Sequence, residues 1–165
     1  MNIKIFVTGG TFDKEYNEIS GELYFKNTHV REILNLGRSL LEVDVKKLML
    51  IDSLDMTENE RAKISQHCIA TKSKHIVVTH GTDTMSETAK TLASHMLKKT
   101  IVLTGAMIPY KFGSSDGLFN LGCALAFVQA LPHGVYIAMN GKYFNWDEVK
   151  KNKRLGKFEK IAKNI

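Results

Sequence analysis

The sequence predicts a doubly wound α/β domain, in which a parallel sheet carries helices on both faces. Short segments rich in β-branched and apolar residues recur along the chain, and segments with the spacing of amphipathic helices separate them. Several of these helical segments begin with capping residues. A strand–helix–strand alternation repeated four times requires crossover connections, which place the strands parallel and the helices over both faces. The expected architecture is flavodoxin-like or Rossmann-like.

Five segments are expected to form the buried strands. Each is short and almost entirely apolar or β-branched, which is the composition of strands that are covered on both faces. They are residues 3–7, 43–51, 75–79, 100–104 and 135–139. Residues 12–28, which follow the first strand, are mostly polar and contain Gly21, so we expect a loop there.

Helix start signals stand between these strands. Thr57 with Glu60 and Thr84 with Glu87 both have the spacing of a capping box, in which each side chain accepts a hydrogen bond from the other residue's backbone N–H. Asp116 is expected to cap a third helix, because an apolar helical segment follows it. Each helix then returns the chain to the start of the next strand.

Composition indicates one globular domain, which we place at residues 1–165. Hydrophobic residues make up 44% of the 165 and charged residues 24%, close to ordinary globular usage. Cys68 and Cys123 are expected to be reduced, because two distant thiols cannot form the disulfide framework of a small secreted protein. The N-terminus lacks a signal-peptide pattern, and no apolar run approaches the roughly eighteen residues that span a bilayer. We therefore expect a cytoplasmic protein without a membrane partner.

Most of the positive charge lies near the C-terminus. The formal net charge is +6, and residues 142–163 contain eight Lys or Arg against three Asp or Glu. Such a segment can contact nucleic acid or an acidic surface, but it is more often a solvated face. No aromatic residues interleave with the charges in the pattern of a nucleic-acid site. We interpret 142–165 as a basic, solvated C-terminal segment of the domain.

Polar residues and glycines follow every predicted strand. In open parallel sheets ligands bind beyond the carboxyl ends of the strands, where loops and helix N-termini meet. The segments at these ends are TGGT at 8–11, DSLDM at 52–56, HGTDT at 80–84, GAMIP at 105–109 and NG at 140–141. One edge of the sheet therefore collects hydroxyls, carboxylates and glycines.

These clusters favour a hydrolytic site. A glycine pair lets the backbone approach a ligand closely, and a neighbouring base turns a Thr or Ser hydroxyl into a nucleophile. Taken singly, Gly9-Gly10 is better explained as a tight turn and the threonines as helix caps, but several such clusters on successive strands favour the site. The turn lacks both the Walker lysine and the G-x-G-x-x-G spacing, which argues against nucleotide binding. Neither HExxH nor CxxC occurs, so the sequence indicates no metal.

At these positions the sequence resembles the bacterial-type L-asparaginases. The hallmarks of that family are the segment after the first strand, here TGGTFDK, and the strand with its HGTDT loop, here VVTHGTDTMSETA. The stretches VLTGAMIP and SSDGLFNL also look like the family, so the resemblance covers roughly residues 3–155. HGTDTM in this setting is a highly specific signal.

The resemblance implies a set of catalytic residues. Thr11 would be the nucleophile, and Thr82, Asp83 and Lys151 would form a second polar group beside it. Lys151 lies in WDEVKKN, which looks like the family's lysine segment, so its ammonium would pair with Asp83 and activate Thr82. Lys150 is the competing candidate for this role.

The resemblance also implies how a substrate is held. DSLDM looks like the family's substrate-carboxylate segment, so Asp52 and Ser53 are the expected binding residues there, with Ser53 and nearby backbone amides on the α-carboxylate. Asp83 would contact the substrate ammonium. The backbone N–H groups of Thr82 and Ala106 are candidates for an oxyanion hole.

A tyrosine on the loop after the nucleophile closes the site in this family. Spacing favours Tyr24 over Tyr16, and a packing role for either aromatic stays open. The phenol would accept or relay the nucleophile's proton, which requires a perturbed pKa. His80 lies beside Thr82, but the resemblance gives it a structural part, and a buried, hydrogen-bonded histidine is the commoner case.

The implied function is hydrolysis of the side-chain amide of L-asparagine, with glutamine as a possible second substrate, through an acyl-threonine and without a cofactor. Family members usually carry a second domain, which contributes an acidic residue to a neighbouring subunit, and they associate; we expect a homo-oligomer. Two alternatives stay open. One is a non-catalytic sensor that binds aspartate or asparagine, and the other is an amidotransferase component that acts on misacylated transfer RNA, with the basic segment contacting phosphates.

Overall fold

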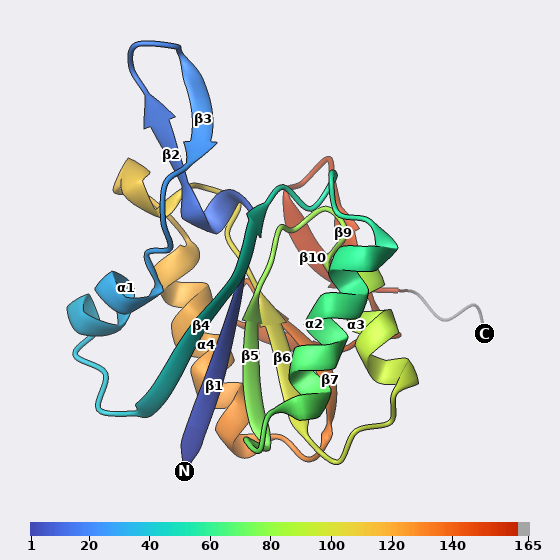
Figure 1. Ribbon diagram of the computed structural model, residues 1–165. Coiled ribbons are helices and arrows are strands. Elements are labelled where there is room, and N and C mark those ends of the chain that lie inside the picture. The colour runs from blue at the N-terminus through green and yellow to red at the C-terminus, as the bar shows by residue number, and fades with distance from the viewer. Residues whose placement is uncertain (162–165) are drawn as a thin grey trace.

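The computed structural model describes residues 1–161 and shows a mixed sheet of six strands with four α-helices (Figure 1). The sheet order is β4-β1-β5-β6-β7-β8. Neighbouring strands are parallel from β4 to β7, and β8 runs antiparallel to β7. The strands are β1 (Asn2–Gly9), β4 (Glu42–Ile51), β5 (His75–Thr79), β6 (Thr100–Thr104), β7 (Gly134–Met139) and β8 (Lys142–Asn145). All five predicted strands are confirmed, and β8 is an addition to them.

Helices cover both faces of this sheet, which confirms the doubly wound α/β class (Figure 1). One pair of helices packs on each face, and a separate hydrophobic core lies under each pair. The helices over one face are α1 (Val30–Leu36) and α4 (Gly117–Ala130), and those over the other are α2 (Glu58–Ala70) and α3 (Met85–Ser94).

Strand periodicity divides the two cores. Successive side chains of a strand point to opposite faces of the sheet. In β1, Ile5 and Val7 belong to the core under α1 and α4, whereas Phe6 belongs to the core under α2 and α3. All five residues of β6 are buried, because the central strands are covered on both faces. Edge strand β4 alternates instead between exposed and partly buried residues along its first half.

One predicted capping box is confirmed. Thr57 is the N-cap of α2, its hydroxyl accepts a hydrogen bond from Asn59 N at 3.2 Å, and Glu60 returns the contact by accepting from Thr57 N at 2.8 Å. Two of the four unpaired N–H groups at this helix end are thereby satisfied.

The second capping box is not formed. Thr84 is the N-cap of α3, but its hydroxyl donates to the carbonyl oxygen of Ser53 at 2.8 Å and so ties α3 to the loop after β4. Glu87 pairs with the buried guanidinium of Arg61 on α2 instead of reaching back. Asp116 similarly holds the N-cap position of α4 without a side-chain cap, because its carboxylate binds the loop after β6. At the N-termini of both α3 and α4, the capping side chain therefore bonds to a different loop and not to the backbone of its own helix.

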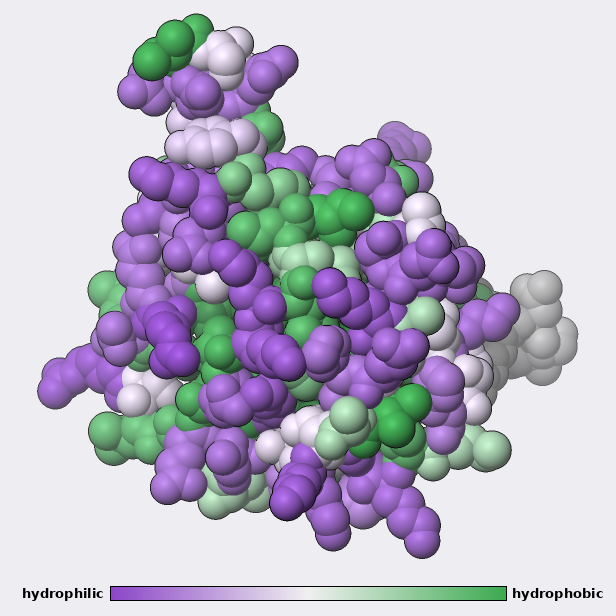
Figure 2. Space-filling model, viewed as in Figure 1, coloured by the Kyte–Doolittle hydropathy of each residue, from purple (hydrophilic) through white to green (hydrophobic). Residues whose placement is uncertain are grey.

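The expected loop at residues 12–28 contains a hairpin. A short 3₁₀ helix, Thr11–Asp13, leads into β2 (Lys14–Asn17), which pairs antiparallel with β3 (Glu22–Phe25). The side chain of Asn17 accepts from the N–H groups of Ile19 and Ser20, and Gly21 completes the turn at φ 73°. The hairpin projects from the body, and apolar side chains lie at its tip (Figures 1 and 2). A loop was therefore the wrong expectation for residues 14–25.

The basic C-terminal segment also folds. After β8, the strands β9 (Val149–Asn152) and β10 (Lys157–Lys160) form an antiparallel pair. Val149 and Phe158 are buried in the core under α2 and α3, while most of the lysines face solvent. The last four residues of the predicted segment 142–165 lie outside the described residues. The expectation of a solvated face holds for the lysines but not for the backbone.

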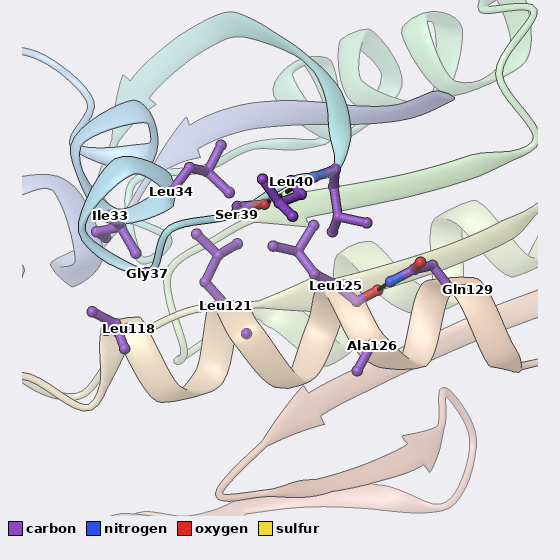
Figure 3. A pocket seen from close by; sticks show the side chains of 12 residues that line it. Ile33, Leu34, Gly37, Ser39, Leu40, Leu118, Leu121, Leu125, Ala126 and Gln129 are labelled. Carbon is purple, nitrogen blue, oxygen red and sulfur yellow. Dashed lines mark hydrogen bonds between the residues drawn. The ribbon is translucent and has the colours of Figure 1, made fainter. Parts of the chain in front are cut away.

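An apolar pocket of about 390 Å³ lies between α1 and α4 (Figure 3). Leu34, Leu121 and Leu125 line it, together with Leu40, whose side chain is almost fully exposed. None of the predicted site residues contributes to this pocket.

Both cysteines are free, as expected. Burial raises the pKa of the Cys68 thiol to about 12, so it is an inert core group. No helix within residues 1–161 has the length and apolarity needed to cross a membrane.

Candidate active site

Three strand-end loops meet through their backbones. A Cβ added to Gly10, after β1, would lie 2.4 Å from the N and Cα atoms of Gly81, after β5. A Cβ added to Gly81 would lie 2.5 Å from the Cβ and Oγ atoms of Ser53, after β4. Atoms do not approach this closely without a clash, so only glycine fits at both positions. The segments TGGT, DSLDM and HGTDT are therefore in direct contact.

The loop after β6 joins the same group. A Cβ added to Gly105 would lie 2.3 Å from the carbonyl oxygen of His80 and 3.4 Å from Cγ2 of Thr82. Ala106 follows and is 1% exposed. The structure thus brings the loop that contains Ala106 against the loop that contains Thr82.

Thr11 stands at the start of the 3₁₀ helix, directly after the Gly10–Gly81 contact. Gly10 N donates to the carbonyl oxygen of Ile51 at 2.9 Å, and Asp13 N donates to the carbonyl oxygen of Gly10 at 3.1 Å. These bonds fix the turn that presents Thr11, which is partly exposed. Its position one residue after Gly10 places it next to the loop that carries Thr82.

Lys151, from β9, binds both polar residues of the HGTDT loop. Its ammonium donates to Thr82 Oγ1 at 2.8 Å and to Asp83 Oδ1 at 2.8 Å. The Lys151 side chain is 13% exposed, Asp83 is partly exposed and Thr82 is buried. Lys150, the competing candidate, is 57% exposed and pairs with Glu159 at 3.6 Å. The contact expected for the family's lysine is therefore made by Lys151.

The loop after β4 supplies two further polar residues. Asp52 forms an ion pair with Lys14 of β2 and accepts from Leu54 N at 3.0 Å. Burial raises the pKa of the Asp52 carboxyl, but the hydrogen bonds from Lys14 and from Leu54 N, together with the charges of Lys14 and Lys151, outweigh it, and the net pKa lies below the usual value. Ser53 is 1% exposed, and its hydroxyl has no hydrogen-bond partner among the described residues.

The two candidate tyrosines stand on opposite faces of the hairpin. Tyr24 is paired across the ladder with Glu15, and Tyr16 with Leu23. Residues opposite each other share a face, while neighbours along a strand alternate. Tyr16 therefore shares the face of Lys14, which reaches Asp52, and Tyr24 shares that of Glu15. Both side chains are exposed, at 54% for Tyr16 and 38% for Tyr24.

His80 is buried and hydrogen-bonded at both ring nitrogens. Nδ1 lies 2.8 Å from the carbonyl oxygen of Gly81, and Nε2 lies 2.8 Å from Thr88 Oγ1 on α3. Burial lowers its pKa to about 4, which the contact with Gly81 partly offsets. The ring is neutral near pH 7, and these contacts match the structural part expected for it.

Sequence reasoning missed several residues that shape this edge. Asp13 is fully buried, and its Oδ1 accepts from Thr28 Oγ1 at 2.9 Å and from His29 N at 3.0 Å, which joins the two ends of the hairpin. Burial raises the pKa of Asp13 to about 6. Asn120 donates to Gly105 and accepts from Asn140 N, which links the loop after β6 to the loop after β7. The i, i+4 spacing of Asp116 and Asn120 was the available signal for that link.

Within residues 1–161, no three His, Cys, Asp or Glu side chains lie close enough to hold a metal ion. The polar side chains at this edge are hydroxyls and two carboxylates, and each carboxylate already accepts from a lysine, Lys14 or Lys151. Such a set suits a polar organic ligand and proton transfer between oxygen and nitrogen atoms.

Comparisons with known proteins agree with this geometry. The family description "Asparaginase, N-terminal" matches residues 2–161. L-asparaginase 2 of Escherichia coli is 33% identical over 162 residues, which are 91% of this chain and 46% of the relative. A glutamyl-tRNA(Gln) amidotransferase component of Pyrococcus abyssi is 32% identical over 85% of this chain and 34% of that relative.

A solved structure extends the similarity to three dimensions. The thermostable L-asparaginase from Thermococcus kodakarensis superposes with a TM-score of 0.85 and 27% identity, over 98% of this chain and 51% of that one. The chain thus spans about half the length of the proteins that it matches. Because the family description covers nearly every described residue, and the fold agrees, the chain belongs to the asparaginase family and corresponds to its N-terminal domain.

Proposed function

We propose that this chain hydrolyses the side-chain amide of L-asparagine to L-aspartate and ammonia, with Thr11 as the nucleophile. The observation that carries the proposal is the contact of Lys151 with Thr82 and Asp83, in a loop that packs against the Thr11 turn through Gly10 and Gly81. Membership of the asparaginase family supports an amidohydrolase.

In the proposed reaction the Thr11 oxygen attacks the amide carbon. The C–O bond forms, the C–N bond breaks, and the Thr11 proton leaves with the amine as ammonia. Water then hydrolyses the acyl-threonine, releasing aspartate and returning a proton to Thr11. The Thr82 hydroxyl accepts from Lys151 and so keeps its own proton free to donate towards the reacting groups. No step uses a cofactor.

Substrate groups find complementary partners around Thr11. The buried hydroxyl of Ser53 is unpaired among the described residues and would bind the α-carboxylate, while Asp52 anchors its loop. Asp83 retains one carboxylate oxygen beyond the contact with Lys151 and would receive the α-ammonium. The N–H groups of Thr82 and Ala106 would stabilise the oxyanion.

The assay that tests the proposal is ammonia release from L-asparagine and L-glutamine by the wild type and three variants. Thr11→Ala should lower kcat by about a thousandfold or more, as expected for a missing nucleophile. Lys151→Met should lower kcat by about a hundredfold or more. Lys150→Met, the matched control one residue away, should stay within about twofold of wild type. Full turnover by Thr11→Ala would contradict the assignment.

The tyrosine is tested with a matched pair. Tyr24 is the prediction from spacing, and Tyr16 is the competitor because it shares a hairpin face with Lys14. Tyr24→Phe and Tyr16→Phe each remove one hydroxyl from an exposed ring, so neither should affect folding. The variant that loses turnover identifies the proton-relaying phenol. Equal activity of both with wild type would show that neither phenol takes part.

The relatives support a second candidate, an amidotransferase component acting on misacylated transfer RNA, since a glutamyl-tRNA(Gln) amidotransferase component is among them. RNA-dependent ammonia release with a steep salt dependence would favour it. Calorimetric binding of asparagine without ammonia release would instead indicate a sensor. We also propose that the chain is cytoplasmic and that it forms a homo-oligomer. Size-exclusion chromatography with light scattering would test the oligomeric state.

A further inference from the structure

Asn120 is a fully buried polar residue of α4, and both of its N–H groups and its carbonyl oxygen are hydrogen-bonded. Its Nδ2 donates to the carbonyl oxygen of Gly105 at 3.0 Å and to Asp116 Oδ2 at 2.9 Å, and its Oδ1 accepts from Asn140 N at 3.1 Å. A carboxamide has two N–H donors and an oxygen with two acceptor sites, and here both donors meet acceptors and the oxygen meets one donor. The orientation of this amide is therefore fixed by its surroundings.

The first branch of these contacts holds the loop after β6. Asn120 donates to the carbonyl oxygen of Gly105, the residue before Ala106. Asp116 accepts from the N–H groups of Met107 and Ile108 at 3.0–3.1 Å. Together the two side chains bind the backbone of this loop on both sides of Ala106. The loop that faces Thr82 is thereby attached to the first turn of α4.

The second branch continues to the hairpin that carries Lys151. Asn140 directly follows β7 at φ 56°, and its Oδ1 accepts from Phe158 N at 3.0 Å. Phe158 of β10 is the ladder partner of Lys151 on β9. The N–H of Phe158 bonds to Asn140, so this bond fixes β10 to the end of the main sheet directly opposite the lysine.

We propose that Asn120 and Asn140 are positioning residues, which act in series to hold Lys151 against Thr82 and Asp83. This inference rests on the proposed function, in which Lys151 serves the site. Within residues 1–161, β9 and β10 pair only with each other, so the ladder alone does not fix Lys151 relative to the main sheet. The Asn140 contact supplies a connection at the register position of Lys151.

The most selective variant is Asn140→Gly. Glycine adopts φ 56° without strain, and the backbone N–H that donates to Asn120 remains, so only the acceptor for Phe158 is lost. Asn140→Asp keeps that acceptor and should rescue. Arg38→Gly, at φ 50° after α1, controls for placing a glycine at a left-handed position away from the site.

The primary readout does not depend on catalysis. Pulse labelling of lysines with an acylating reagent, mapped by mass spectrometry, reports how often the Lys151 ammonium leaves its contacts. Labelling of Lys151 should rise about five- to tenfold in Asn140→Gly, as expected for the loss of one buried hydrogen bond. It should remain at the wild-type level in Asn140→Asp and Arg38→Gly. The exposed Lys150 is the internal reference and should label equally in all four proteins.

The second readout is whether the variants change kcat or KM for ammonia release. A displaced Lys151 should lower kcat in Asn140→Gly more than it changes KM, and Asn140→Asp should restore kcat. Asn120→Asp, which removes both donors but keeps the acceptor, should lower kcat through the first branch. Unchanged labelling of Lys151 in Asn140→Gly would overturn the proposal. Rising labelling in a protein without amidase activity would instead leave the positioning intact and contradict the proposed function.

Discussion

The ammonium of Lys151 lies between two acceptors that come from a different part of the chain, and this arrangement gives the edge of the sheet its chemical character. Asp83 balances the positive charge, and Thr82 is left with a hydroxyl proton to donate. Desolvation of such a pair is costly unless its remaining bonding capacity is used. The pair is only partly buried, so water or a ligand can complete its bonding.

Asp13 provides a test of electrostatics at the residue scale. Burial raises its folded-state pKa to about 6 from a reference value of 3.8, so the folded protein binds more protons than the unfolded chain between these values. The free energy of unfolding should therefore fall as the pH rises through this window, by up to about 3 kcal/mol from this group. Asp13→Asn should remove that slope.

Urea unfolding of the wild type and Asp13→Asn at pH 4.5 and pH 7.5 measures the effect. The variant should gain stability relative to wild type at the higher pH. Asp55→Asn, at an exposed position, controls for the general loss of a negative charge. A stability difference between Asp13→Asn and wild type that is the same at both pH values would refute the burial argument.

His80 changes the free energy of unfolding with pH in the opposite direction to Asp13. Its folded-state pKa is lowered to about 4 from 6.5, so its contribution to stability is present above pH 6.5 and is lost as the pH falls towards 4. The ring should stay neutral from pH 5.5 to 8. Nitrogen-15 NMR of labelled histidines measures this directly, with the exposed ring of His133 for comparison. A titration of His80 near pH 6.5 would contradict its burial against Gly81 and Thr88.

At the scale of elements, the strands were predicted because their composition follows from burial on both faces, as β5 and β6 show. The β2–β3 hairpin was missed because its side chains are half polar and its pairing is local, so neither a buried strand nor an amphipathic helix is signalled. The capping box at Thr84 failed for a different reason. Its hydroxyl binds Ser53, a residue 31 positions earlier, and no local pattern reveals such a partner.

Some features of the candidate site could likewise be predicted from the sequence, and others could not. Parallel topology brings strand ends together, so the convergence of TGGT, DSLDM and HGTDT could be expected from the sequence. The resemblance to the family supplied the lysine, and the structure selects Lys151 over Lys150. Asn140 was expected at a strand end, but the roles of Asn120 and Asn140 were not foreseen, because they depend on hydrogen bonds between elements far apart in the sequence.

The contact between Gly10 and Gly81 yields a prediction at this scale. Gly10 and Gly21 both have positive φ angles, 77° and 73°, so alanine is strained at either position; the strain is larger at Gly10, whose ψ of −176° lies in a region that is essentially restricted to glycine. A Cβ at Gly21 meets nothing within 4 Å, whereas one at Gly10 meets the Gly81 backbone at 2.4 Å. Gly10→Ala should therefore lose at least about 1–3 kcal/mol more than Gly21→Ala. Equal losses in denaturant unfolding would show that the loops do not touch.

On the scale of the whole molecule, loops from four parallel strands and the β9–β10 hairpin converge on one edge of a single sheet. The basic segment contributes to this edge because β9 carries Lys151. The chain spans about half the length of the relatives that it matches, and yet the contacts of Lys151 with Thr82 and Asp83 form entirely within it. We therefore expect the amide-attacking groups to work from this domain.

The proposed reaction depends above all on attack by the Thr11 hydroxyl on the substrate amide. Affinity labelling tests this with an L-asparagine analogue in which a diazoketone replaces the side-chain amide, so that the attacking oxygen displaces N2 and forms a stable ether that peptide mapping can locate. We expect one modified residue, Thr11, and protection by excess L-asparagine. A label on Thr82, Ser53 or any other residue that L-asparagine protects, with Thr11 unmodified, would contradict it.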